Sequence, residues 1–185
     1  CFHGSHDSVA MNVISRPERV GEKDPLSIGI LPEVIDGTLV LPFNDLEAVR
    51  HAVAEHRDEI AAISLEPIPH KVGAILPEQQ FLEGLRTICT KEGIVLIFDE
   101  VITGFGRTGE WFALKHWGVK PDILSFAKAI TSGYAQLGGI QISDKIRETM
   151  ESAPESEAYM HGFNYSGHAM ACAVGLKNLE IMERD

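Results

Sequence analysis

Apolar runs alternate with amphipathic segments along most of the chain. Runs with the length and composition of strands occupy residues 38–43, 61–67, 94–101, 123–127 and 137–143. Segments with helical periodicity or composition lie between them, at 44–60, 77–93 and 110–118. Repeated β-α-β order with strands that are apolar on both faces predicts an α/β fold, with a mostly parallel sheet flanked by helices.

Several residues mark where the predicted helices begin and end. Asn44 and Glu47 have the spacing of a capping pair at the start of the helix over 44–60. Pro77 suits the first position of the next helix, and Gly93 suits its end. The stretch 14–37 lacks such signals, so we expect a long loop there, with a functional or subunit-contact role.

The ends of the chain suggest part of a longer protein. Residue 1 is Cys rather than Met, and an amphipathic helical pattern runs to Asp185 without a Gly or Asn terminator. We therefore expect a fragment.

Composition narrows the possible partners and the cellular compartment. The 185 residues carry 27 acidic and 16 basic side chains, for a formal net charge of −11, which disfavours nucleic acid and anionic membranes. The apolar runs are too short to cross a bilayer and no leader pattern opens the chain, so a cytoplasmic location is expected. Cys1, Cys89 and Cys172 have no C-x-x-C spacing, which argues against a disulfide framework or a metal site.

Side chains that could take part in catalysis or cofactor binding lie at the ends of three of the predicted strands. Glu66, Asp99 and Lys128 each lie where an apolar run ends. Open α/β sheets bind ligands beyond the carboxyl ends of their strands, and an acid and a lysine directed at one site suit pyridoxal phosphate. The lysine would form a Schiff base and the acid would keep the ring nitrogen protonated. On spacing alone, Asp99 could equally be a salt-bridged acid or a loop cap, and Lys128 a solvated lysine.

A second motif, "GFGRTG" at 104–109, matches the dinucleotide-binding pattern G-x-G-x-x-G. Five residues, "DEVIT", separate the apolar core of the strand from Gly104, whereas that pattern needs its first glycine at the turn between strand and helix. Asp122, the acid about twenty residues further on, precedes a strand instead of ending one. A nicotinamide-dependent reductase is therefore disfavoured.

Three separated stretches carry a family resemblance. The segment "LIFDEVITGFGRTGEWFALKHWGVKPDILSFAKAITSGYAQLGG" resembles the signature region of class III pyridoxal-phosphate aminotransferases. "CFHGSHDS" and "HGFNYSGHAMACA" (161–173) are similar to earlier and later segments of that family. The resemblance implies the large domain of fold-type I pyridoxal-phosphate transferases. Residues 1–185 would form part of this cofactor-binding domain, without the N-terminal segment or the C-terminal small domain.

The resemblance also implies roles for individual residues around the cofactor ring. Lys128 would be the imine lysine and Asp99 the partner of the ring nitrogen. Phe2 would stack on one face of the ring and Val101 would pack against the other.

Three further residues would surround this centre. Glu66 matches a glutamate close to cofactor and substrate. His3, next to Phe2, would lie in the cofactor-binding region with a structural rather than an acid-base role. Asn164 stands where the family usually has a threonine that reaches the cofactor phosphate of the neighbouring subunit. The asparagine amide can still donate a hydrogen bond to phosphate, but it is longer and planar.

Subgroup features favour the ω-amino acid:pyruvate aminotransferases. Relatives that act on 4-aminobutyrate, ornithine or acetylornithine have an arginine where this chain has Ser5. Glutamate-semialdehyde aminomutases lack stretches similar to "GFGRTGEWF" and "TSGY". The resemblance thus implies a homodimer that moves an amino group from an ω-amine to a keto acid such as pyruvate. An aminomutase and a non-catalytic cofactor-binding fragment remain alternatives, and we expect the isolated chain to be inactive.

Overall fold

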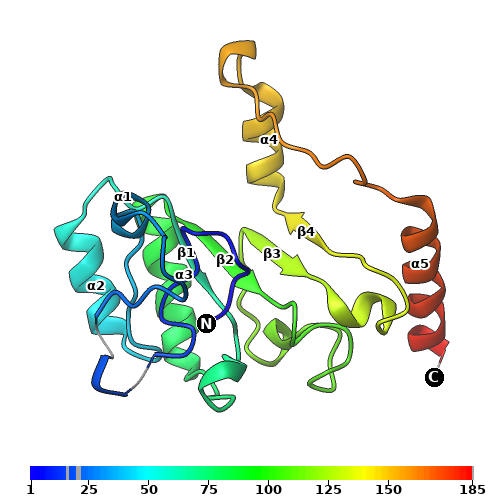
Figure 1. Cartoon of the computed structure of the whole chain (residues 1–185), viewed down its shortest axis with the longest axis horizontal. Coiled ribbons are helices and arrows are strands. Elements are labelled where there is room, and N and C mark those ends of the chain that lie inside the picture. The colour runs from blue at the N-terminus through cyan, green and yellow to red at the C-terminus, as the bar shows by residue number, and fades with distance from the viewer. Residues whose placement is uncertain (16, 20–21, 185) are drawn as a thin grey trace. The chain divides into compact units, whose positions relative to one another are not determined.

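The computed structural model describes residues 1–15, 17–19 and 22–184. It divides the chain into two compact units, Cys1–Leu96 and Ile97–Asp185. Strand β2 (Val95–Asp99) runs through the boundary between them. The described strands are ordered β1-β2-β3-β4 in one sheet (Figure 1).

The other strands of this sheet are β1 (Ala62–Leu65), β3 (Ile123–Phe126) and β4 (Gly139–Ile142). Strand β3 pairs with β2 in parallel and with β4 in antiparallel orientation. The α/β class is confirmed, and β4 departs from the parallel arrangement. Parallel strands are usually connected by a crossover helix, whereas 127–138 contain only the short turn η4 (Lys128–Thr131).

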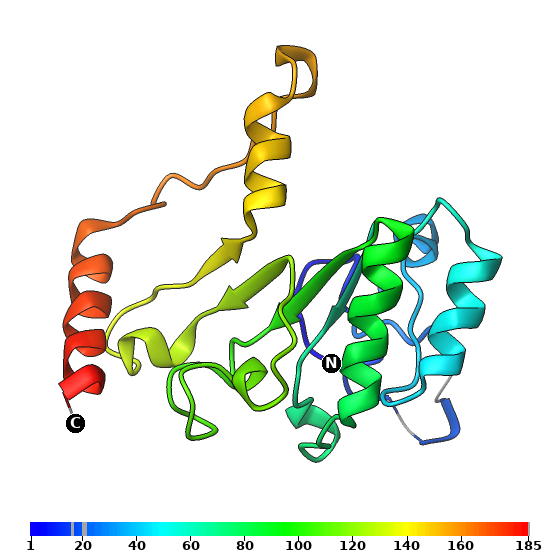
Figure 2. The ribbon, with the colours of Figure 1, turned by 180° about the vertical axis from the view of Figure 1, so that it is seen from behind.

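The first unit contains the short turns η1 (Pro17–Arg19) and η2 (His70–Val72) and the helices α1 (Pro32–Asp36), α2 (Leu46–Glu55) and α3 (Gln79–Glu92). Helices α2 and α3 pack together, and α3 runs beside β1 in both views (Figure 2). Buried apolar side chains include Val49, Leu65, Leu82, Leu85 and Leu96. Burial of this apolar surface stabilises the unit.

The predicted strand over 38–43 is absent from the described structure, which has irregular backbone and a turn there. Leu39, Val40 and Leu41 remain about 40% exposed. A residue's preference for strands acts through packing against neighbouring strands, and this segment has none in the sheet. The prediction of a strand was therefore wrong.

Capping differs from the prediction for α2. Asp45, and not Asn44, is the N-cap residue, and its Oδ1 accepts from the Ala48 backbone N–H at 2.9 Å. Asn44 adopts a positive φ of 64° and donates through Nδ2 to the Leu76 carbonyl at 3.0 Å. Glu47 pairs instead with Arg50. Asn44 and Asp45 are adjacent, and the side chain of either could cap this helix. The side chain of Asn44 is instead bound to the Leu76 carbonyl, 32 residues away in the sequence, and Asp45 takes the capping position.

Helix α3 begins after Pro77, with Glu78 as its N-cap. Gly93 ends the helix in the left-handed region at φ 72°, as predicted, because glycine adopts this conformation without a steric penalty. The loop predicted over 14–37 contains η1 and α1, and its residues 16, 20 and 21 lie outside the described part of the chain.

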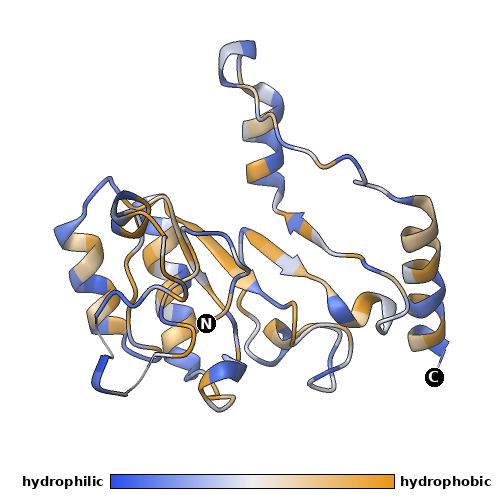
Figure 3. Ribbon diagram, in the orientation of Figure 1, coloured by the Kyte–Doolittle hydropathy of each residue, from blue (hydrophilic) through white to orange (hydrophobic). Residues whose placement is uncertain are grey.

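The second unit contains the short turns η3 (Ala113–His116), η4 and η5 (Glu155–Glu157) and the helices α4 (Asp144–Ser152) and α5 (Ala169–Arg184). Its core includes an aromatic cluster in which the ring centroid of Phe105 lies 5.1 Å from that of Phe112 and 5.8 Å from that of Phe126. Apolar residues mark β2 and β3 (orange in Figure 3). The helix predicted over 110–118 is a single 3-10 turn, and α4 was not predicted.

Within the part of the chain that the structure describes, no helix combines the length and apolar character required for a membrane span.

Candidate functional site

Asp99 and Lys128 lie at the carboxyl ends of two neighbouring parallel strands. Asp99 ends β2 and is in register with Ser125 of β3. Lys128 comes two residues after the end of β3. The Glu100 N–H donates to the Ser125 carbonyl at 2.9 Å and ties the two strand ends together. Because paired strands lie about 4.8 Å apart, this topology places the acid and the lysine at one edge of the sheet.

The Asp99 carboxylate is largely removed from water. The residue is 8% exposed, and its Oδ1 accepts a hydrogen bond from the Val101 backbone N–H at 3.1 Å. This contact makes a tight turn directly after β2 and brings half-buried Val101 beside the acid. A buried carboxylate at a strand end is a candidate partner for a cationic group of a ligand.

Lys128 lies in an unusual backbone conformation. Its φ is 50°, in the left-handed region that L-amino acids other than Asn and Asp seldom adopt. Ala127 before it is extended, with φ −161° and ψ −152°, so the chain turns sharply between the two residues. The Lys128 residue is exposed in this chain.

Glu100 is a buried carboxylate that the sequence patterns did not assign. It is 0% exposed, and its two oxygens accept three hydrogen bonds: from Thr103 Oγ1 at 2.8 Å, from the Ala113 N–H at 2.6 Å and from the Leu114 N–H at 2.8 Å. Ala113 and Leu114 begin η3, so Glu100 closes the long turn that follows β2. Of the two adjacent acids, Glu100 is therefore structural and Asp99 is the candidate for chemistry.

We expect replacement of Glu100 to destabilise the fold strongly. In Glu100→Ala, buried N–H groups lose their acceptor, at about 1–3 kcal/mol for each unsatisfied group. The free energy of unfolding should fall by about 3 kcal/mol or more, measured by urea denaturation of the complete protein.

Glu110→Ala is the matched control, because Glu110 is an exposed acid in the same turn region. Glu100→Gln keeps the volume but replaces one acceptor oxygen with a donor, so it should also lower the denaturation midpoint. A midpoint unchanged in both Glu100 variants would contradict this structural role.

Glu66 organises the N-terminal segment of the first unit. It is 3% exposed, and its Oε1 accepts from the Phe2 backbone N–H at 2.7 Å. Its Oε2 lies 2.9 Å from His70 Nδ1 and accepts from the His70 N–H at 3.4 Å. Glu66 thus fixes the backbone of Phe2 at the end of β1, next to half-buried His3. His70 was not singled out from the sequence, because its role depends on a contact with a side chain four residues away.

Asn164 lies in the second unit, in the exposed segment 158–168 that precedes α5. Several large apolar side chains of this stretch and of the start of α5 are also exposed: Tyr159, Met160, Phe163, Tyr165 and Met170.

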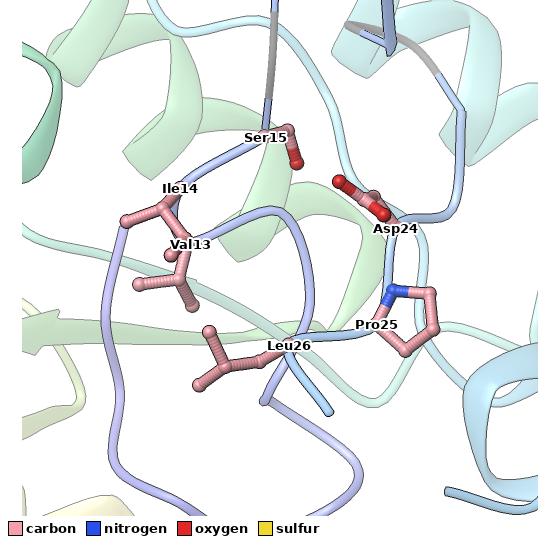
Figure 4. A pocket seen from close by; sticks show the side chains of 6 residues that line it. All are labelled: Val13, Ile14, Ser15, Asp24, Pro25 and Leu26. Carbon is pink, nitrogen blue, oxygen red and sulfur yellow. The ribbon is translucent and has the colours of Figure 1, made fainter. Parts of the chain in front are cut away.

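A shallow hollow of about 170 Å³ lies elsewhere in the first unit (Figure 4). It is lined by Val13, Ile14, Ser15, Asp24, Pro25 and Leu26. None of the candidate residues of the first unit, Phe2, His3 or Glu66, lines it. The chemistry of the strand ends therefore identifies the candidate site better than this hollow does.

Comparison with known proteins gives one consistent family. The family model described as "Aminotransferase class-III" matches residues 1–185. Among curated relatives, a glutamate-1-semialdehyde 2,1-aminomutase from Ignicoccus hospitalis is 38% identical over 184 residues, which are 100% of this chain and 42% of that protein. An omega-aminotransferase from Caulobacter vibrioides is 42% identical over 144 residues, 77% of this chain and 32% of that protein.

Solved structures agree with this result. An omega-transaminase from Sphaerobacter thermophilus matches 98% of this chain and 42% of its own with a TM-score of 0.82 and 30% identity. An (S)-enantioselective omega-transaminase from Thermomicrobium roseum matches 75% of this chain and 31% of its own with a TM-score of 0.70 and 46% identity. The chain thus spans about two fifths or less of the length of these relatives.

Proposed function

The chain belongs to the class III aminotransferase family, and from this premise we propose that the complete protein is a pyridoxal-phosphate-dependent transaminase. It would move an amino group from an ω-amine or ω-amino acid to a keto acid such as pyruvate. Relatives named omega-aminotransferase and putrescine–pyruvate aminotransferase, each 42% identical over their matched regions, support this choice of substrates.

The placement of Asp99 and Lys128 after adjacent parallel strands carries the proposal. The two side chains fit the cofactor in kind: a buried carboxylate suits a protonated ring nitrogen, and an exposed primary amine suits the aldehyde. When bound, the cofactor ring supplies an electron sink for the substrate carbon that loses its proton.

Each candidate residue would then have a separate role in the reaction. Lys128 would hold the cofactor covalently and, once displaced by the donor amine, carry the proton between the substrate carbon and the cofactor. Asp99, held by the Val101 N–H, would keep a positive charge on the ring nitrogen. Val101 and Phe2 would pack on the faces of the ring, with Phe2 positioned through Glu66.

We further propose that residues 1–185 are part of the large cofactor-binding domain of a homodimer. The exposed apolar side chains of the stretch 159–170 support a subunit contact, since large exposed apolar patches mark interaction surfaces. In this dimer the Asn164 amide would donate to the cofactor phosphate of the neighbouring subunit. Functional experiments therefore use the complete protein.

An aminomutase is the second candidate, because the Ignicoccus hospitalis relative matches the whole chain at 38% identity. An aminomutase returns the amino group to the same carbon skeleton, whereas a transaminase delivers it to a separate keto acid. Incubation of the complete protein with an ω-amine, with and without pyruvate, tests the proposal. Alanine formed only when both substrates are present supports a transaminase. In a parallel incubation with glutamate-1-semialdehyde, isomerisation of this compound, with no alanine formed in the first incubation, supports the alternative.

Donor preference gives a second test, centred on Ser5. An arginine at this position would clamp the distal carboxylate of a donor, at about 1.5–3 kcal/mol for a charge-assisted hydrogen bond. Because this chain has serine there, 4-aminobutyrate should be a poorer donor than a simple ω-amine by about 10-fold or more in kcat/KM.

Ser5→Arg is the matched variant and should narrow the difference in kcat/KM between simple ω-amines and 4-aminobutyrate. A wild-type preference for acetylornithine over simple ω-amines would contradict the assignment of substrates.

A further inference from the structure

The turn that carries Lys128 is held in a strained backbone conformation. Lys128, the first residue of η4, has a φ of 50°, and Ser132, directly after η4, has a φ of 49°. Gly133 follows at 83°. Non-glycine residues in the left-handed region cost on the order of 1–3 kcal/mol each and persist only where surrounding contacts fix them. The turn therefore needs restraint from another part of the fold.

Asn178, on α5, provides this restraint. Its Nδ2 donates to the carbonyls of Ala129 at 2.9 Å and Ile130 at 3.1 Å, within η4. Its Oδ1 accepts from Ser132 Oγ at 2.7 Å. One side chain thus contacts three of the four positions from 129 to 132, all but Thr131. Both ribbon views place α5 beside η4 (Figures 1 and 2).

Gly175, one helical turn before Asn178, lies where α5 faces Leu137 and Ile130. A Cβ at Gly175 would lie 2.9 Å from Leu137 Cδ2 and 3.8 Å from the Ile130 carbonyl oxygen. Within the turn, Thr131, 1% exposed, donates through Oγ1 to the Ala135 carbonyl at 2.6 Å. The turn is therefore fixed both by its own hydroxyl and by the amide of Asn178.

We infer that Asn178 is a positioning residue for Lys128. Asn178 holds the carbonyls of Ala129 and Ile130 and the hydroxyl of Ser132. These contacts keep the backbone at Lys128 in the conformation from which the lysine amine reaches the candidate site. The role of the Lys128 amine in this inference rests on the proposed function. The three hydrogen bonds of Asn178 to the turn, called the clamp below, lie within the second unit and do not depend on that function.

Asn178→Asp tests the inference in the complete protein. Aspartate has nearly the same shape but lacks both N–H donors, and it places a carboxylate against two carbonyl oxygens. We expect kcat to fall about 10²-fold, the scale of a displacement of about 1 Å at a reacting group, with little change in the KM of the amine donor. Lys177→Ala, an exposed change one residue earlier on α5, should leave kcat unchanged.

An isotope effect separates positioning from a merely structural role. If Lys128 is displaced, proton transfer slows, so deuterium on the donor carbon that loses its proton should reduce kcat more in Asn178→Asp than in wild type. A variant that only lowers the folded fraction leaves this ratio unchanged. Ser132→Ala removes one contact of the clamp. It should lower kcat and raise the isotope effect on kcat, each by less than Asn178→Asp does. Wild-type kcat and isotope effect in Asn178→Asp would overturn the inference.

Amide hydrogen exchange tests the clamp independently of the proposed function. Without substrate, the amides of residues 129–135 should exchange faster in Asn178→Asp than in Lys177→Ala. Unchanged exchange would overturn the clamp even in an active enzyme. Faster exchange in a protein without transaminase activity would refute the proposed function and leave the clamp in place.

Discussion

Lys128→Ala is expected to abolish covalent attachment of pyridoxal phosphate to the complete protein. Borohydride reduction of the wild type should fix the cofactor to the peptide that contains Lys128, as detected by mass spectrometry, and the variant should give no such adduct. Because the same amine would serve as general base and acid, transamination should fall by at least the 10²–10⁴-fold typical of that role.

Lys145→Ala is the control, since Lys145 is an exposed lysine on α4 in the same unit. It should retain both the trapped adduct and the wild-type rate. A trapped adduct at wild-type level in Lys128→Ala would show that another amine holds the cofactor, and the assignment of Lys128 would then be wrong.

The sequence predicted the elements whose signals are local. The apolar runs became β1, β2, β3 and β4, and Gly93 ended α3 as predicted, because its left-handed conformation depends on the residue alone. The predicted strand over 38–43 failed because a strand requires a partner, which a single run of residues does not reveal. The antiparallel direction of β4 likewise depends on what connects it to β3.

The candidate site was predictable to a similar depth. Position at the end of an apolar run was enough to single out Asp99, Lys128 and Glu66. The supporting contacts were not, because they join residues far apart: Glu100 reaches Ala113 and Leu114 across 13 and 14 residues, and Asn178 reaches η4 across almost 50. Nor does any local pattern reveal the positive φ of Lys128, since lysine seldom adopts the left-handed region.

Asp99→Asn should slow transamination while leaving the fold and the covalent attachment of the cofactor largely intact. Asparagine keeps an oxygen that can accept from the Val101 N–H, so the turn after β2 should survive. It lacks the negative charge that would hold the ring nitrogen protonated. We expect the half-reaction with an amine donor, followed by stopped-flow absorbance, to slow on the order of 10²-fold or more, which is about 2.7 kcal/mol of barrier.

A cofactor analogue with a methylated ring nitrogen sharpens this test, because its positive charge does not depend on residue 99. Asp99→Asn loaded with the analogue should recover much of the rate lost with the natural cofactor. Asp144→Asn, which removes an exposed carboxylate of α4, should need no such rescue. If Asp99→Asn reacts at the wild-type rate with the natural cofactor, Asp99 is a structural acid whose function is to turn the chain after β2. If the rate is lost and the analogue does not restore it, Asp99 contributes through the geometry of that turn and not through its charge.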